Sequence, residues 1–268
     1  MKLELFASWE LIDTGIGTAE WNMAVDEALL RNFKDGDSPI FRLYRWEESL
    51  SVGKFSNVER SVDLESLKRQ NLACVRRMSG GGVLLHGGDL SYSLIAPRKL
   101  LKSKGVKESY RYLCGFLITL YEKLGYRAQF AGELGSSSKS SNICMASNEK
   151  YDILIGGKKM GGNAQRHTRK VLFQHGSVPL NMNKSRLAEL FLEESGADNV
   201  ATLRELGCSL KEERLAQTLI EAVVETFGVE TVSVSLTHEQ LILAKELLKN
   251  KYAREEWNSH AKQNSSQA

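Results

Sequence analysis

The chain has 268 residues, of which 42% are hydrophobic and 26% are charged, a balance typical of ordinary soluble proteins. This length allows one large domain or two small ones with a substantial core. The formal net charge of +3 permits an acidic partner but does not demand nucleic acid, so we expect no nucleic-acid partner.

No apolar run reaches the length that spans a bilayer, and the first residues do not form a signal peptide. We therefore expect a cytoplasmic protein with no membrane partner. Four cysteines, Cys74, Cys114, Cys144 and Cys208, are scattered without a Cys-x-x-Cys pair. A zinc site or a disulfide framework is not expected, and each cysteine is interpreted as a free thiol.

The first third of the chain is predicted to alternate strands and one long helix. After one or two short strands, Thr18 has the side chain of a helix N-cap, and the apolar spacing predicts a helix over residues 18–33. Glu27 is expected on the solvated face of this helix. Residues 40–46 alternate apolar and polar as a half-buried strand should, with residues 51–55 as the paired return strand.

A glycine-rich loop follows the predicted strand 72–75, with the sequence Arg76-Arg77-Met78-Ser79-Gly80-Gly81-Gly82. Three residues without Cβ let a ligand approach the main chain closely. The two arginines have forked donors that suit carboxylate or phosphate oxygens. The loop lacks the ending of a P-loop and the spacing of a dinucleotide fingerprint. A ligand-binding loop and a glycine-rich hairpin with solvated arginines both fit this local pattern.

Two strands, residues 83–86 and 90–95, follow the loop and are predicted to form a hairpin. His86 ends the first strand and is either a core histidine or a ligand contact. Residues 107–124 form an amphipathic pattern that predicts one helix with Cys114 on its apolar side. A serine-rich loop then leads into a short apolar patch that contains Cys144.

Cys144 and Lys159 are candidates for an acyl-transfer dyad on neighbouring strands. Residues 151–155 read as a strand that turns at Gly156-Gly157 and returns through Lys159. The amine would take the thiol proton, and the thiolate would attack a thioester. For this the pKa of the lysine must fall well below about 10, and burial beside arginines acts in that direction. Alternatively, Cys144 is a small core residue.

The last third of the chain is mostly helical. Ser209-x-x-Glu212 and Thr237-x-x-Gln240 read as capping boxes that each open a helix. Residues 259–268 read as a polar, disordered tail. Because strands cluster in the first two thirds and helices follow, the order predicts an α+β sheet covered by helices.

At the glycine loop and the lysine segment, the chain resembles the lipoate–protein ligase, octanoyltransferase and biotin–protein ligase superfamily. Residues 76–86 resemble the family's acyl-binding loop, and residues 157–165 resemble the segment with its invariant lysine, which falls on Lys159. Residues 21–28 and 251–258 resemble its first helix and the usual end of its catalytic domain. The resemblance implies a class II synthetase-like, biotin-ligase-like mixed sheet covered by helices. It also implies a single catalytic domain over residues 1–258.

Two features favour the cysteine-dependent octanoyltransferases of Gram-positive type within this superfamily. Cys144 lies where those enzymes place a Cys-Phe pair, and Gln165 and residues 174–177 are similar to their Ala-Gln and Gln-His-Gly-Ser stretches. The absence of an accessory domain after the catalytic domain favours the same branch.

This resemblance implies an acyltransferase of lipoate biosynthesis. It would move octanoate from octanoyl acyl carrier protein, through a thioester on Cys144, to a lysine of a lipoyl domain such as the glycine-cleavage H protein. Lys159 would be the general acid and base. The expected substrate-binding residues are Arg76, Arg77, Ser79, Gly80, Gly81, Gly82, His86, Gly162, Asn163, Ala164 and His175.

No metal and no cofactor are expected for this reaction, and we expect a monomer. ATP and Mg enter only if the chain is instead an ATP-dependent lipoate–protein ligase, in which Cys144 is structural. A lipoyl-domain octanoyl amidotransferase and a non-catalytic acyl- or biotin-sensing module are further alternatives.

Overall fold

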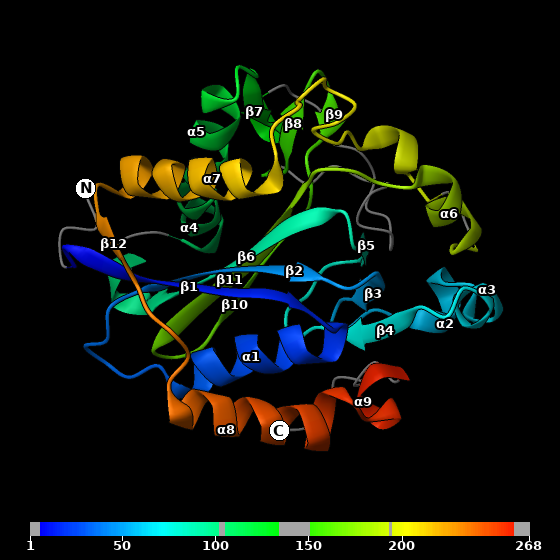
Figure 1. The fold of residues 1–268 in the computed structure, drawn as a ribbon, viewed down its shortest axis with the longest axis horizontal. Helices are drawn as coiled ribbons and strands as arrows, with labels where there is room; N and C mark the ends of the chain where they lie inside the picture. The colour runs from blue at the N-terminus through cyan, green and yellow to red at the C-terminus, as the bar shows by residue number, and fades with distance from the viewer. Residues whose placement is uncertain (1–5, 102–104, 134–150, 193–194, 260–268) are drawn as a thin grey trace.

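The computed structural model describes residues 6–101, 105–133, 151–192 and 195–259, and it is built around a mixed central sheet (Figure 1). Among these residues six strands pair in the order β10-β11-β6-β2-β1-β12. β1 runs parallel to β2 and β12, whereas β2, β6, β11 and β10 pair antiparallel. These strands are β1 (Ser8–Gly17), β2 (Ile40–Trp46), β6 (Asp89–Pro97), β10 (Asn163–His167), β11 (Val171–Pro179) and β12 (Glu230–Ser233).

Two smaller sheets flank the central one. The first has the order β4-β3-β5 and carries the glycine-rich loop between β4 and β5. The second has the order β7-β8-β9 and carries the lysine segment. Their strands are β3 (Ser49–Val52), β4 (Ala73–Arg76), β5 (Val83–His86), β7 (Ala128–Phe130), β8 (Ile153–Ile155) and β9 (Lys158–Lys159).

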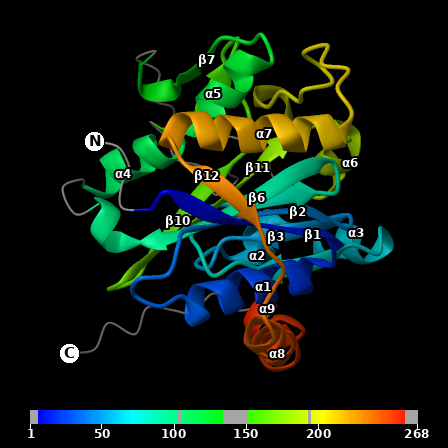
Figure 2. The same ribbon diagram turned by 60° about the vertical axis from the view of Figure 1, so that its left-hand side comes forward.

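Helices cover both faces of the central sheet because its strands are apolar on both sides. Phe41 and Leu94 point into a core shared with α5 and α7, whereas Ile40 and Ile95 point into the core beside α1. α8 packs against the outer side of α1 (Figures 1 and 2). The long helices are α1 (Ala19–Asn32), α4 (Val106–Leu113), α5 (Gly115–Lys123), α7 (Glu212–Phe227) and α8 (His238–Leu247).

Short helical segments complete the described chain, and no described helix has the length and apolarity to cross a membrane. The predicted tail falls almost wholly on residues 260–268, outside the described residues. The short segments are α2 (Val58–Ser61), α3 (Leu64–Arg69), η1 (Arg98–Leu101), η2 (Ala131–Glu133), α6 (Lys184–Glu189), η3 (Ala197–Asn199), η4 (Leu248–Tyr252) and α9 (Glu255–Ser259).

Local signals at helix starts were mostly confirmed. Thr18 caps α1, its hydroxyl accepting from Trp21 N at 3.2 Å. The Thr237 capping box is present at the start of α8. The capping box predicted at Ser209 is wrong, because α7 begins at Glu212 with Lys211 as its N-cap.

The predicted hairpins are wrong. The strand after residue 46 does not return along β2, because β3 pairs with β4 and β5 instead. β5 and β6 belong to different sheets, since the chain turns away at Gly87, whose φ is +112°. The single helix predicted over residues 107–124 is divided at Cys114 into α4 and α5.

Glu27 was predicted to be solvated, but its side chain is only 3% exposed. Lys251 and Tyr252 both donate to its carboxylate, since η4, which follows α8 directly, packs against α1. Burial alone would raise the pKa of Glu27, but the hydrogen bonds from these two residues hold that pKa below its ordinary value. Glu27 therefore ties the C-terminal helices to α1.

Candidate active site

A pocket lies where the glycine-rich loop faces the beginning of β10 and the end of β11. The space between its walls, part of it open to solvent, is about 380 Å³. Aromatic and aliphatic side chains of β2 and β5 supply its apolar wall. The lining residues are Tyr44, Trp46, Arg77, Gly81, Leu84, His86, Ser91, Gly162, Asn163, Ala164, His175, Gly176 and Ser177.

The structure brings together many of the residues that the sequence singled out. Arg77, Gly81, His86, Gly162, Asn163, Ala164 and His175 all line this pocket. Ser79, Gly80 and Gly82 belong to the same loop but are not among the lining residues, and neither are Arg76 and Lys159. Cys144 lies outside the described residues.

Arg77 holds the glycine-rich loop in a closed curve. Its Nη1 donates to the carbonyl and hydroxyl of Ser51, at 2.9 and 2.8 Å. Its Nη2 donates to the carbonyl of Gly82 at 2.9 Å. Since both nitrogens of the fork bind residues around the loop, Arg77 fixes the loop's shape while also lining the pocket.

Arg76 makes structural contacts with two backbone segments. Its side chain is buried, and its guanidinium is directed away from the pocket lining toward two backbone segments. Arg76 is not among the pocket-lining residues, and its predicted role in substrate binding stays a prediction. It donates to the carbonyls of Gly53, Lys54, Ser56, Trp257, Asn258 and Ser259.

The same C-terminal segment also holds the main chain of Arg76. The amide of Arg76 donates to Asn258 Oδ1, and its carbonyl accepts from Trp257 Nε1, both at 2.9 Å. We call residues 257–259 the C-terminal clamp. The clamp sets the position at which the glycine-rich loop begins.

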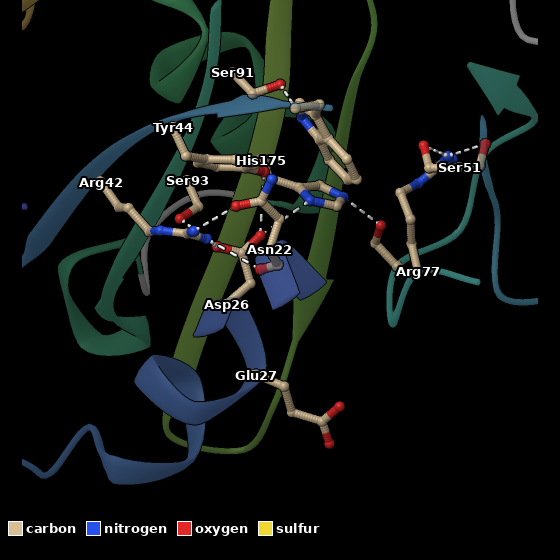
Figure 3. A network of polar contacts seen from close by, with 12 residues as sticks. Asn22, Asp26, Glu27, Arg42, Tyr44, Ser51, Arg77, Ser91, Ser93 and His175 are labelled. Atoms are coloured by element: carbon tan, nitrogen blue, oxygen red, sulfur yellow. Dashed lines mark hydrogen bonds and ion pairs between the residues drawn. The ribbon is translucent and has the colours of Figure 1, made fainter. Parts of the chain in front are cut away.

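His175 connects the loop to α1 through a buried polar network (Figure 3). Its Nδ1 lies 3.6 Å from Asp26 Oδ2, and its Nε2 lies 2.5 Å from Ser79 Oγ. Burial lowers the pKa of His175, so the ring is neutral at pH 7. With the proton on Nδ1, facing the carboxylate, Nε2 accepts from the Ser79 hydroxyl.

Asp26 is the charged centre of this network. It pairs with Arg42 at 2.6 Å, both side chains being fully buried, and it accepts from Ser93 and Tyr44 (Figure 3). Burial would raise the pKa of Asp26, but Arg42 and the hydrogen bonds hold it below its ordinary value. The carboxylate therefore stays ionised and keeps Tyr44 and His175 in fixed orientations beside the pocket.

His86 belongs to a second chain of polar contacts on the other side of the pocket. Its Nδ1 lies 3.0 Å from Asp89 Oδ2, and its Nε2 lies 2.7 Å from Ser51 Oγ. Ser51 is the residue that binds Arg77. Trp46 stacks on the His86 ring with 4.0 Å between centroids. Both histidines thus support loop residues as well as line the pocket.

Lys159 is buried in an ion pair with Asp152, with 2.7 Å between Nζ and Oδ2. The sequence predicted a lysine beside arginines, which would favour the neutral amine. Among the described residues, the Asp152 carboxylate lies next to the lysine. Lys158 is exposed, as a solvated lysine should be.

Close backbone contact explains part of the glycine pattern. A Cβ at Gly53 would lie 1.8 Å from the carbonyl oxygen of Gly81, whose φ is +100°. The loop and the turn after β3 therefore touch through main-chain atoms. Among the described residues the amides of Gly80, Gly81 and Gly82 have no main-chain or side-chain acceptor, so they are available to a bound carbonyl or anion.

Sequence reasoning missed the residues that support the site. Asp26, Arg42 and Asp152 were not singled out, because a charge that is paired across the fold has no local signature. Tyr44 and Trp46 read only as strand residues. No group of three or more potential metal ligands occurs within the described ranges.

Comparisons with known proteins place the chain in a family. The model of the family described as "Lipoyl protein ligase A/B catalytic domain" matches residues 18–228. The curated protein "Octanoyltransferase LipM" of Kyrpidia tusciae is 33% identical over 270 residues, covering 94% of this chain and 98% of that protein. The protein of the same name from Oceanobacillus iheyensis is 33% identical over 246 residues, covering 87% and 90%.

Solved structures agree with these matches. The structure titled "Crystal structure of lipoate-protein ligase A bound with ATP" superposes with a TM-score of 0.84 at 27% identity, covering 95% of this chain and 99% of that one. This similarity confirms the predicted α+β fold with a mixed sheet covered by helices. The chain belongs to the lipoyl protein ligase A/B catalytic-domain family.

Proposed function

We propose that this chain, an octanoyltransferase of lipoate biosynthesis, moves octanoate from acyl carrier protein to a lysine of a lipoyl domain through a thioester on Cys144. Its acyltransferase activity is supported by relatives named octanoyltransferase that are 33% identical over most of the chain. The observation that carries the chemical proposal is the buried Lys159–Asp152 pair, in which Lys159 precedes the pocket-lining Gly162 by three residues.

The pocket suits a medium-length acyl chain with a carbonyl head. Tyr44, Trp46 and Leu84 supply apolar surface, and Gly162 to Ala164 form the wall that leads toward Lys159. The amides of the glycine-rich loop are available to the carbonyl. We propose that Arg77 keeps these amides in place and that no cofactor takes part.

Lys159 is proposed to donate a proton in the first half-reaction and to accept one in the second. In the first, the Cys144 thiolate adds to the carrier thioester, and the new tetrahedral carbon then expels the carrier sulfur, which takes a proton from the Lys159 ammonium. In the second, the acceptor amine displaces Cys144. The amine's proton returns to Lys159, and Asp152 stabilises the ammonium that forms.

Mass spectrometry of the intact protein tests this proposal. After mixing with octanoyl acyl carrier protein, we expect one octanoyl adduct that disappears in Cys144→Ala and persists in the matched control Cys208→Ala. Adding a lipoyl domain should move the octanoyl group to its lysine without ATP. The absence of an adduct, or an adduct that survives Cys144→Ala, would reject the thioester.

ATP-dependent lipoate ligation is the second candidate, because the structure titled lipoate-protein ligase A bound with ATP shares this fold at 27% identity. Modification of a lipoyl domain that requires free lipoate and ATP, with release of pyrophosphate, would favour it. In that case Cys144→Ala should leave the reaction rate unchanged.

A further inference from the structure

Asn163, in the pocket wall, is the end of a hydrogen-bond chain that the reaction above does not use. Tyr92 OH lies 2.7 Å from Asn163 Oδ1 and donates to it. Gln174 Nε2 donates to the same hydroxyl at 2.9 Å, and Gln174 Oε1 accepts from Gln165 Nε2 at 2.7 Å. Burial raises the pKa of Tyr92 well above its ordinary value, so the phenol keeps the one proton that it donates to Asn163.

Strand register places this chain across three neighbouring strands. Asn163, Gly176 and Tyr92 are directly opposite one another on β10, β11 and β6. A Cβ at Gly176 would lie 2.0 Å from Asn163 Oδ1, so the asparagine side chain crosses the backbone in space that only glycine leaves open. Tyr110 OH also donates to the Asn163 carbonyl at 2.8 Å. The residue is therefore held at both its main chain and its Oδ1.

Fixing Oδ1 decides which end of the amide a ligand can use. Since the Asn163 oxygen is bound to Tyr92, its Nδ2 is the remaining polar atom of the side chain, and this nitrogen has no acceptor among the described residues. Asn163 is partly exposed and lines the pocket. It follows Lys159 by four positions, so an acyl group with its chain in the pocket and its head toward Lys159 passes Asn163.

We propose that Asn163 Nδ2 donates a hydrogen bond to the carbonyl oxygen of the bound octanoyl group, with Tyr92 and Gln174 as positioning residues. This inference rests on the proposed octanoyl transfer and names a catalytic group for it. When a nucleophile adds to the carbonyl carbon, a bond forms there and the π electron pair moves to the oxygen. Asn163 stabilises that oxygen, which returns the pair when the carbon–sulfur bond to the carrier breaks. Asn163 stays neutral throughout.

Steady-state kinetics of octanoyl transfer by the full chain provide the first test. Asn163→Asp keeps the shape but loses the donor, and removing one such donor is expected to lower kcat by roughly a hundredfold to a thousandfold with little change in KM. Tyr92→Phe keeps the ring but lets the amide turn, and should lower kcat by about threefold to tenfold. Asn163→Ser, with a shorter donor, should recover part of the lost rate.

A matched control and a melting curve separate this role from a structural one. Asn250→Ala, on the exposed side of η4, should leave both kinetic constants unchanged. The Asn163 and Tyr92 variants should melt within a few degrees of the parent protein. Unchanged kcat in Asn163→Asp, or a change confined to KM, would overturn the proposal.

An infrared measurement tests the hydrogen bond without turnover. The carbonyl band of bound [1-13C]octanamide should lie at lower wavenumber in the parent protein than in Asn163→Ala, with Tyr92→Phe between them. A shifted band without octanoyl transfer would refute the proposed function while supporting this contact. Transfer with an unshifted band, or no bound band in the parent protein, would refute the contact.

Discussion

Replacing Asn258 by alanine should weaken the glycine-rich loop from a position outside the pocket. Asn258 makes two side-chain hydrogen bonds, accepting from the Arg76 amide at 2.9 Å and donating to the Tyr252 carbonyl at 2.7 Å. Alanine removes both and leaves the Arg76 amide without its acceptor. The start of the loop then loses one of the contacts through which the C-terminal clamp holds it.

The expected loss of stability follows from these contacts. Each hydrogen bond contributes about 1 kcal/mol, and an unsatisfied amide adds to the loss, so the free energy of unfolding should fall by about 2–3 kcal/mol. For a chain of this size that is roughly 4–12 °C in melting temperature. The KM for the octanoyl donor should rise by about tenfold if roughly 1.4 kcal/mol of binding is lost.

Urea denaturation and steady-state octanoyl transfer measure the two effects on the same sample. Asn250→Ala is the matched control, because Asn250 lies on the nearby η4 segment and is exposed. This control should change neither quantity. If Asn258→Ala behaves like Asn250→Ala in both assays, the clamp does not support the loop and the reasoning is refuted.

Three further predictions concern buried charges and the close backbone contact. Asp152→Asn should lower the free energy of unfolding by about 3 kcal/mol, and adding Lys159→Met should restore part of that loss. Urea denaturation of the single and double variants measures both effects, and strictly additive losses would contradict the pairing. Because the folded-state pKa of Glu27 is lowered, its stabilising effect is complete above its ordinary pKa of 4.5 and is lost as the pH falls through the lowered value. Glu27→Gln should reduce the loss of unfolding free energy at acid pH, measured by denaturation across a pH series. An unchanged pH dependence would contradict the assignment. Gly53→Ala, which puts a Cβ 1.8 Å from Gly81 O, should abolish octanoyl transfer, whereas Gly105→Ala, with no atom within 4 Å, should not.

Local signals in the sequence predicted the elements whose partners are close in the chain. Thr18 and Thr237 cap their helices through side-chain hydrogen bonds to residues only three positions further along the chain. Gly156 and Gly157 form the turn that delivers Lys159, with φ of +58° and +80°. The hairpin predictions failed because two strands that are neighbours in the chain can belong to different sheets. The local sequence does not show which sheet a strand joins.

The candidate site was also predictable only in part. The glycine pattern and the lysine segment were recognisable from sequence, and residues from both, such as Gly81 and Gly162, meet in one pocket. The different contacts of Arg76 and Arg77 were not predictable, since Trp257, Asn258 and Ser259, which bind Arg76, lie more than 180 positions away. The roles predicted for Cys144 and Lys159 stay predictions.

The clamp also has a consequence for how the protein is made. Arg76 and Asn258 are 182 positions apart, so the ribosome completes almost the whole fold before the segment that secures the start of the loop has been synthesised. A nascent chain that already contains every pocket-lining residue still lacks this support. Competence to hold an acyl group should therefore appear late in translation.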